Sequence, residues 1–476
     1  MKRIPYIIVV FIVFIVSKTF AQSIPADSLS NLKEKAEKGD VYAQFDLGRL
    51  YHNNKDYNKA AYWFNLAAQQ GDADAQYNYG TCYYQGQGVE QDNDQSFYWM
   101  KKSAEQGHLY AQYYLGTFYE SGIGTPKDYF LAFSWYKKSA EQGYMISQYN
   151  LGVCYDEGRG VSKDYNQAVL WYTKAAEKDL ASAQYNLGIC YYEGRGVEKD
   201  YKQAVQWITK AAEQANANAQ SWLGDYYYKS KNYNQAILWF KKAADQNQVA
   251  ALNNLGMCYY NGQGVPQDFR QAVYWYEKAA RLGNVNAQCN LGKCYFNGQG
   301  VAKDHNKAAY WLMKAAEKED ALSQFNLGIY YRDREEKKQD YQQAVYWFKK
   351  SAEKGYANAQ YCLGLCYHNG QGVIKSYEQA FYWFEKAAKQ GDAGAQCNIG
   401  VYYSNGYVGS QDYSQAVSWF EKAAKQGYTK AQYNLAVCLY KGEGCLKDEK
   451  MAIYWLKEAA KQGSTDAKTL LNLIQH

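Results

Sequence analysis

One segment of this sequence recurs along almost the whole chain with a fixed period. Residues 183–210 read AQYNLGICYYEGRGVEKDYKQAVQWITK, and one glycine, which usually follows a leucine, marks the same place in each copy. These anchor positions are Gly48, Gly80, Gly116, Gly152, Gly188, Gly224, Gly256, Gly292, Gly328, Gly364 and Gly400, with Ala436 in the twelfth place. They lie 36 residues apart, except for two steps of 32 after Gly48 and Gly224. Such a period predicts an array of small repeats rather than one central core.

The first half of each copy predicts a helix that ends at a tight connector. Ala183, Leu187 and Tyr191 recur at a spacing of four, which places them on one face of a helix. Gly194 and Gly196 follow, and glycine accepts the positive φ angles that stop a helix and turn the chain. We therefore expect a first helix followed by a short glycine-based turn in each copy.

The second half of each copy predicts a second helix. Asp200 stands three residues before Gln203, which is the spacing of a capping box at a helix N-terminus. Ala204, Trp207 and Ala211 then form an apolar stripe. Because each helix is apolar on one side only, it needs a neighbouring copy to bury that side, and the copies are expected to stack end to end.

The first 21 residues are predicted to be a secretory signal peptide. Lys2 and Arg3 precede an apolar run over residues 4–16, and Ala21 ends the segment with a small side chain. The run is shorter than the ~20 apolar residues that span a bilayer, although an uncleaved anchor remains the alternative. We expect a secreted or periplasmic protein with no integral membrane segment in the mature chain. Removing three positive charges lowers the net charge from +6 to +3, which is too weak to indicate nucleic-acid binding.

The remaining chain divides into three parts. Residues 22–40 are expected to form a linker and an N-terminal capping helix, residues 41–464 twelve repeats, and residues 465–476 a C-terminal capping helix. Leu470, Leu471 and Ile474 are placed to close the C-terminal end of the stack. No segment rich in Pro, Gly or Ser interrupts the repeats, which favours one elongated domain.

The repeat pattern resembles that of a known family. The consensus A-x-x-x-L-G-x-x-Y-x-x-G-x-G-V-x-x-D-Y-x-x-A-x-x-W-x-x-K-A-A is similar to the Sel-one-like repeat, a relative of the tetratricopeptide repeat (TPR). The match runs from about residue 30 to the end of the chain. This resemblance implies an all-α fold, a right-handed α/α superhelical solenoid of about twelve helix-turn-helix repeats whose first helices line the concave side.

The resemblance also implies a function. Family members serve as non-enzymatic scaffolds or adaptors that bind a protein or peptide, and some exported bacterial members act on host factors. Two alternatives stay open. One is a β-lactam-interacting, hydrolase-like protein of a cysteine-rich bacterial branch, and the other is a luminal adaptor in protein degradation in the endoplasmic reticulum.

Three positions per repeat are candidates for ligand contact. By resemblance to TPR folds, the residues three before, one after and four after the anchor face the groove. Most of these residues are aromatic, and tyrosine suits contact surfaces because it is rigid and amphipathic. The candidates are Tyr77, Tyr84, Tyr113, Tyr149, Tyr185, Tyr192, Asp225, Tyr228, Tyr260, Lys293, Phe296, Phe325, Tyr361 and Tyr433. Charged departures such as Asp225, Lys293, Arg332 and Glu120 are the better candidates for specificity.

No motif predicts catalysis, a metal or a cofactor. Ser351 and Lys354 match the S-x-x-K nucleophile motif of β-lactam enzymes, but the companion S-D-N and K-T-G motifs are absent. The five histidines are scattered without an H-E-x-x-H motif. The Gly-x-Gly connectors lack the Lys-Ser/Thr of a phosphate-binding loop. We therefore expect no catalytic residue, no bound metal and no cofactor.

Most cysteines share one position, two residues after the anchor. They are Cys82, Cys154, Cys190, Cys258, Cys294, Cys366 and Cys438. Neighbouring first helices are expected about 9–10 Å apart, whereas a disulfide needs Cα atoms within about 7 Å. Buried free thiols are therefore expected, although Cys362 and Cys397 could bridge two repeats. The resembled cysteine-rich branch pairs one Cys in each helix of a repeat, which this sequence does not offer.

A penicillin-labelling assay distinguishes a scaffold from the β-lactam alternative. We expect no covalent labelling of the mature chain by a fluorescent penicillin, because Ser351 lacks the partner motifs that an acyl-enzyme site requires. Labelling that disappears in Ser351→Ala, measured by in-gel fluorescence, would contradict this expectation.

Overall fold

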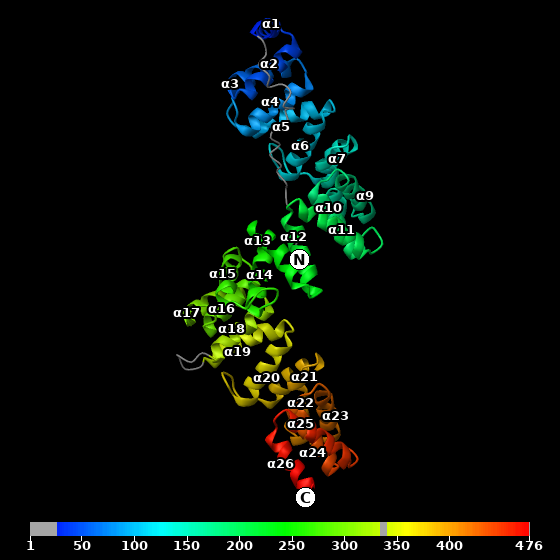
Figure 1. Cartoon of the computed structure of the whole chain (residues 1–476), viewed down its shortest axis with the longest axis vertical. Helices are drawn as coiled ribbons and strands as arrows, with labels where there is room; N and C mark the ends of the chain where they lie inside the picture. The colour runs from blue at the N-terminus through cyan, green and yellow to red at the C-terminus, as the bar shows by residue number, and fades with distance from the viewer. Residues whose placement is uncertain (1–25, 334–339, 476) are drawn as a thin grey trace. The chain divides into compact units, whose positions relative to one another are not determined.

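The protein consists of α-helices joined by short turns. The computed structural model describes residues 26–333 and 340–475, and the 26 regular elements there are all helices (Figure 1). The predicted all-α class and helix-turn-helix architecture are thus confirmed. The predicted signal peptide lies outside the described residues, and the right-handed sense of the solenoid stays a prediction.

Two helices, α1 and α26, flank twelve helix pairs. The N-terminal helix is α1 (Ala26–Glu37) and the C-terminal one is α26 (Thr465–Gln475). The first helices of the pairs are α2 (Val41–Asn53), α4 (Ala73–Gln85), α6 (Leu109–Ser121), α8 (Met145–Glu157), α10 (Ala181–Glu193), α12 (Ala217–Lys229), α14 (Val249–Asn261), α16 (Val285–Asn297), α18 (Ala321–Asp333), α20 (Ala357–Asn369), α22 (Ala393–Asn405) and α24 (Thr429–Lys441). The second helices are α3 (Tyr57–Gln69), α5 (Asn93–Glu105), α7 (Tyr129–Glu141), α9 (Tyr165–Ala176), α11 (Tyr201–Glu213), α13 (Tyr233–Asp245), α15 (Phe269–Arg281), α17 (His305–Ala316), α19 (Tyr341–Glu353), α21 (Tyr377–Lys389), α23 (Tyr413–Lys425) and α25 (Glu449–Lys461).

The described helices group into two compact units, one of residues 26–219 and one of the described residues from 220 onward. In the first unit α1 contributes Leu29 and Leu32 to a cluster around Ala43 and Leu47 of α2. In the second unit Leu470, Leu471 and Ile474 of α26 pack against a cluster around Leu456 of α25. Each terminal helix therefore covers the apolar side of the repeat next to it.

Within a repeat, the two helices meet at the anchor glycine. A Cβ atom at Gly116 would lie 2.6 Å from Cδ1 of Tyr136, and one at Gly364 would lie 2.6 Å from Cδ1 of Phe384. No side chain fits in this space, because real Cβ contacts essentially never fall below 3.0 Å. The ring from the second helix therefore lies directly on the backbone of the first helix.

The main buried residue of each second helix is the one that follows the tryptophan. Ile208 is fully buried in α11, whereas Trp207 is only partly buried. The tryptophan position lies nearer the preceding repeat, as Trp171 does in packing with Ala140 of α7. The Nζ atom of Lys174 lies 4.0 Å from the Trp171 ring centroid. The predicted stripe of Ala204, Trp207 and Ala211 does pack into the core, but the prediction missed Ile208, the large side chain that this helix buries fully.

The connectors hold successive repeats at close range. Gly194 and Gly196 have φ angles of 72° and 69°, as predicted for a glycine-based turn. A Cβ atom at Gly196 would lie 2.1 Å from the carbonyl oxygen of Tyr165, the first residue of the second helix in the preceding repeat. The side chain of Asp200 then caps α11 by accepting the backbone N–H groups of Lys202 and Gln203. The second glycine is therefore required by a contact between repeats as well as by the turn.

A network of glutamines joins the helices at the opposite end of each repeat. In α6 the Gln112 amide nitrogen donates to the Ala104 carbonyl (3.3 Å), and its amide oxygen accepts from Gln142 (2.7 Å). Gln142 also donates to the Gly107 carbonyl (3.0 Å). Equivalent glutamine pairs are Gln70–Gln44, Gln106–Gln76, Gln214–Gln184, Gln246–Gln220, Gln390–Gln360, Gln426–Gln396 and Gln462–Gln432.

Three repeats lack this bond because a lysine replaces the second glutamine. The replacing residues are Lys178, Lys318 and Lys354. Their would-be partners Gln148, Gln288 and Gln324 are buried, and their amide oxygens have no hydrogen-bond partner among the described residues. The repeat over residues 249–284 has no unpaired amide here, because Leu252 and Leu282 replace both glutamines. Burying an unpaired acceptor is costly, so these three sites are local weak points.

Lys354→Gln is expected to stabilise the repeat over residues 321–356. The new amide would donate to Gln324 and add a net hydrogen bond worth about 1 kcal/mol. The exposed Lys354–Glu319 ion pair (3.0 Å) that is lost contributes little. The measurement is hydrogen exchange of amides in α18 and α19. Gln426→Lys, which breaks the Gln426–Gln396 bond, is the matched reverse variant and should accelerate exchange in α22 and α23.

Candidate functional site

The position four residues after the anchor mainly serves contacts between repeats. The Tyr228 hydroxyl donates to the amide oxygen of Gln263 (2.6 Å), and the Tyr260 hydroxyl donates to that of Gln299 (2.9 Å). In both cases the partner is the central residue of the next repeat's Gly-x-Gly connector. These residues, which were predicted to contact a ligand in the groove, therefore use their hydroxyl groups for hydrogen bonds within the protein.

A charged version of the same contact occurs in the first unit. The Arg159 Nη1 atom donates to the Glu120 carboxylate (2.7 Å), which also accepts from the Tyr136 hydroxyl (2.6 Å). One repeat later, Arg195 Nη1 donates to the buried carboxylate of Asp156 (2.7 Å). The charge of Glu120, which the sequence analysis treated as a specificity candidate, is thus neutralised by a neighbouring repeat.

The other predicted residues at this position contact aromatic rings. Tyr192 lies edge-on to Tyr201 at 5.4 Å, and Phe296 lies edge-on to His305 at 5.6 Å. Tyr84 instead contacts Phe118 of the next repeat at 5.4 Å. Each of these rings is partly exposed.

The rings three residues before the anchor differ in exposure. Tyr113 is 2% exposed and Tyr149 is 9% exposed, so both belong to the core and present almost no surface to a ligand. Tyr77 is stacked on His108 with ring centroids 4.6 Å apart. The remaining rings, which are partly exposed, are those of Tyr185, Phe325, Tyr361 and Tyr433.

The two charged candidates one residue after the anchor are partly buried. The Asp225 carboxylate accepts a hydrogen bond from Asn254 of the next repeat (2.7 Å), and burial raises its pKa. Lys293 lies at the equivalent place in α16. Neither Asp225 nor Lys293 lines the hollow to which the partly exposed rings of Phe325 and Tyr361 belong.

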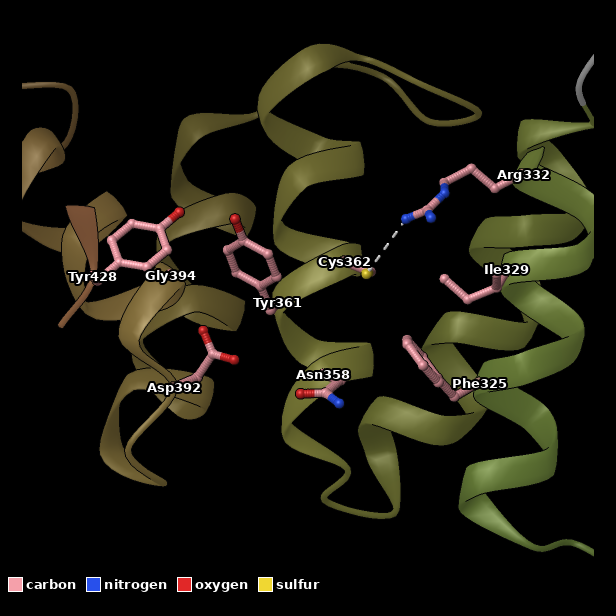
Figure 2. Close-up of a pocket in the computed structure, with 9 residues that line it drawn as sticks. All are labelled: Phe325, Ile329, Arg332, Asn358, Tyr361, Cys362, Asp392, Gly394 and Tyr428. Carbon is pink, nitrogen blue, oxygen red and sulfur yellow. Dashed lines mark hydrogen bonds between the residues drawn. The ribbon is translucent and has the colours of Figure 1, made fainter. Parts of the chain in front are cut away.

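A hollow of about 450 Å³ lies on the first helices of the second unit, and it collects several of the candidates. Figure 2 shows Phe325, Ile329 and Arg332 along one side of α18, opposite residues of α20 and α22. The complete lining is Phe325, Ile329, Arg332, Asn358, Tyr361, Cys362, Asp392, Gly394 and Tyr428. Residues of three successive repeats, from 321 to 428, thus contribute to one site.

Small side chains explain why a hollow forms here. In the repeats over residues 73–144 the equivalent surface is filled by rings, since His108, Tyr110 and Tyr114 all pack around Tyr77. The positions around Tyr361 that match His108, Tyr110 and Tyr114 carry Asp392, Gly394 and Asn398, none of which has a ring. The open space at Tyr361 therefore contrasts with the ring-filled surface around Tyr77.

Gly394 positions the central ring of the hollow. A Cβ atom at Gly394 would lie 3.0 Å from Cζ of Tyr361, so the missing side chain lets this ring lie against the first turn of α22. Figure 2 shows the Tyr361 ring between α20 and the Tyr428 ring. Burial raises the pKa of the Tyr361 hydroxyl, and Tyr428 raises it further. Both hydroxyls are therefore neutral at physiological pH and can donate or accept hydrogen bonds.

Arg332 brings positive charge to the other end of the hollow. Its Nε and Nη2 atoms donate to the Asp333 carboxylate at 2.6 and 2.9 Å. Its Nη1 atom points to the Cys362 sulfur at 3.8 Å (Figure 2). Asp392 caps α22 by accepting the Ala395 backbone N–H (2.7 Å). The hollow thus combines an apolar wall with several hydrogen-bonding groups.

Sequence reasoning found part of this lining and missed the rest. Phe325 and Tyr361 were predicted, and Arg332 was marked as a charged departure. Asn358, Asp392, Gly394 and Tyr428 were missed because they lie six and eight residues before the anchor, outside the three positions considered. The available signal was Gly394, the one glycine at its position among the twelve repeats.

The structure shows no arrangement for nucleophilic or metal chemistry at the motifs considered. Ser351 is fully buried and its hydroxyl donates to the Ala321 carbonyl (2.7 Å), while Lys354 pairs with Glu319. Ser103 makes the equivalent bond to the Ala73 carbonyl, so this serine is a structural replacement for alanine. Within the described residues, no group of three His, Cys, Asp or Glu side chains could hold a metal ion.

All eleven cysteines are free thiols, and ten of them are buried. The expectation of buried free thiols is confirmed for the seven at the shared position. The suggested bridge between Cys362 and Cys397 is wrong, because both residues remain free. Cys397 instead accepts a weak hydrogen bond from Asn434 of the next repeat (3.9 Å).

Comparison with known sequences identifies the family. The profile described as "Sel1 repeat" matches residues 41–72, 73–108, 109–144, 146–180, 181–216, 217–248, 249–284, 285–320, 321–356, 357–392, 393–428 and 429–464. The chain belongs to the Sel1 repeat family. Sel1 repeat proteins are generally protein-interaction scaffolds that bind other proteins.

Solved structures agree with this assignment. A protective antigen present in uropathogenic Escherichia coli strains, which displays an SLR fold, is 35% identical with a TM-score of 0.74. The alignment covers 87% of this chain and 90% of the antigen. A Sel1 repeat protein from Oxalobacter formigenes is 32% identical with a TM-score of 0.52, over 63% of this chain and 90% of that protein. No curated protein matches the sequence.

A helix that crosses a membrane must be long and predominantly apolar. In residues 26–333 and 340–475 each helix is too short or too polar to cross a membrane.

Thiol reactivity should follow burial in this Sel1 repeat protein. Burial raises the pKa of Cys362 to about 11, so the reactive thiolate is scarce at pH 8. Cys445 is the one cysteine that is partly exposed. We expect iodoacetamide to modify Cys445 first and the ten buried thiols only after unfolding, measured by mass spectrometry of tryptic peptides. Modification of Cys362 at the rate of Cys445 in the folded protein would contradict the burial of the Cys362 thiol.

Proposed function

We propose that the protein is an exported, non-enzymatic scaffold that binds an extended segment of another protein across α18, α20 and α22. The single observation that supports this most is the hollow, which is open where the equivalent place around Tyr77 in the first unit is filled with rings. Export rests on the signal-peptide pattern of residues 1–21. The similarity to a bacterial protective antigen is in line with a location outside the cytoplasm.

The lining suits an extended peptide rather than a compact ligand. Neighbouring first helices offer one set of side chains per repeat, so a strand that crosses them meets a new set at each step. Phe325 and Ile329 form an apolar wall for one side chain of the partner. Asn358, Tyr361 and Tyr428 offer amide and hydroxyl groups for its backbone, which has both donors and acceptors. Asp392 adds a carboxylate. Arg332, whose Nε and Nη2 atoms are paired with Asp333, turns its Nη1 atom toward Cys362.

No reaction is needed for this role. The hollow contains Cys362, but its thiol is 9% exposed and has a raised pKa, which opposes nucleophilic chemistry. The host-factor role that the family resemblance implies is a narrower form of the same proposal.

Site-specific photo-crosslinking tests the proposed site. Benzoylphenylalanine at Asn358, an exposed residue of the hollow, is expected to crosslink a discrete partner in the native organism, identified by mass spectrometry. The same probe at Asn286 is the matched control, because this asparagine is equally exposed at the equivalent position of α16 but lies outside the hollow.

Two variants link the crosslink to the hollow's geometry. Gly394→Leu should displace the Tyr361 ring and abolish the Asn358 crosslink, because even a Cβ atom would lie 3.0 Å from that ring. Tyr361→Ser should weaken the crosslink while circular dichroism remains helical. Equal crosslinking at Asn358 and Asn286 would place the partner elsewhere and refute this site.

A further inference from the structure

A second hollow lies in the first unit, at the edge formed by the connectors. It has a volume of about 610 Å³ and is lined by Tyr84, Gln85, Gln87, Gln91, Asn93 and Ile123. These residues come from the end of α4, the connector after it, the start of α5 and the connector of the next repeat. The site shares no residue with the first hollow, and none of the candidates from the sequence analysis except Tyr84 belongs to it.

One substitution opens this space. In ten of the twelve repeats the second helix begins with Tyr, Phe or His, and α5 begins with Asn93 instead. Elsewhere the ring at this place packs on the ring four residues after the anchor, as Phe269 does on Tyr260 at 5.1 Å. Asn93 has no ring, so the corresponding side of Tyr84 is left uncovered. Tyr84 is held from its other side by Phe118 at 5.4 Å.

The lining is rich in amides and carries no charged side chain. Gln91 donates its amide nitrogen to the Tyr84 carbonyl (3.0 Å), which leaves its amide oxygen as an acceptor. The amide oxygen of Gln87 lies 3.3 Å from Nε2 of His52, which leaves its amide nitrogen as a donor. Gln85 and Asn93 are exposed and offer both kinds of group. The hollow therefore presents donors and acceptors around the uncovered face of one aromatic ring.

We propose that this hollow binds a neutral oligosaccharide. A pyranose ring has an apolar C–H face, which the Tyr84 ring can cover, and equatorial hydroxyls that both donate and accept hydrogen bonds, which amide side chains match. A charged ligand would find no counter-ion among the lining residues. The volume lies in the range of small-ligand sites, about 300–1,000 Å³. The binding is a second activity of the scaffold and does not depend on the proposed protein-binding site.

Isothermal titration of the mature chain with the neutral trisaccharides maltotriose, cellotriose and N,N′,N″-triacetylchitotriose tests the proposal, with trigalacturonate as the charged comparison. We expect saturable binding of at least one neutral trisaccharide and none of trigalacturonate. Absence of binding by all three at about 10 mM, a concentration that detects even weak sites, would overturn the assignment. Preferential binding of trigalacturonate would also overturn it.

The repeat itself supplies the decisive variant. Asn93→Tyr introduces the residue that begins most of the second helices, so it should fill the hollow without harming the fold and lower the affinity at least about tenfold. Asp94→Tyr adds the same ring one residue further along α5, outside the lining, and should leave the affinity unchanged. Equal affinities of Asn93→Tyr and the wild type, with unchanged helical content in both, would overturn the site.

Discussion

The structure depends on a contact in which one partner has no side chain. At each anchor glycine, a large apolar side chain of the second helix lies directly on the backbone of the first, as Tyr136 does on Gly116. This contact fixes the distance and the register of the two helices, because a Cβ atom would force them apart. In the last repeat Ala436 replaces glycine, and the side chain near it is the smaller Leu456. The helix pair can therefore be stacked repeatedly with little variation.

Features that depend on local chemistry could be predicted from the sequence. The helix pairs, the Asp200 cap, the positive φ of Gly194 and the free thiols all follow from residue type and spacing. The buried residue after the tryptophan could not be recognised in the same way. Its place is filled by Tyr, Phe, Leu, Ile or Met in different repeats, because the contact requires volume over a glycine rather than a particular residue. The tryptophan, which recurs unchanged, seemed to be the core residue for that reason.

The candidate sites could be predicted only in part, because they form where one repeat carries a smaller side chain than the other repeats do. Phe325 and Tyr361 were identifiable as exposed aromatic candidates, but the space beside them exists since Gly394 has no side chain. Likewise, Asn93 opens a space that Phe269 and other rings close elsewhere. In a repeat protein, function is therefore sought where a repeat departs from the others toward a smaller residue. A search for chemically reactive residues does not detect such departures.

The contacts between connectors and first helices also limit how such a gene can change. His52 is paired with Gln87, Glu120 with Arg159, and Tyr228 with Gln263, each across one repeat boundary. Unequal recombination between the near-identical coding segments could remove residues 73–108 without disturbing the helical phase. The shortened protein would then present the aliphatic Ile123 to His52 in place of an amide. Such side-chain pairs make each repeat complementary to its own neighbours. Deletions, duplications and exchanges of repeats that the backbone alone would tolerate are therefore expected to destabilise the protein.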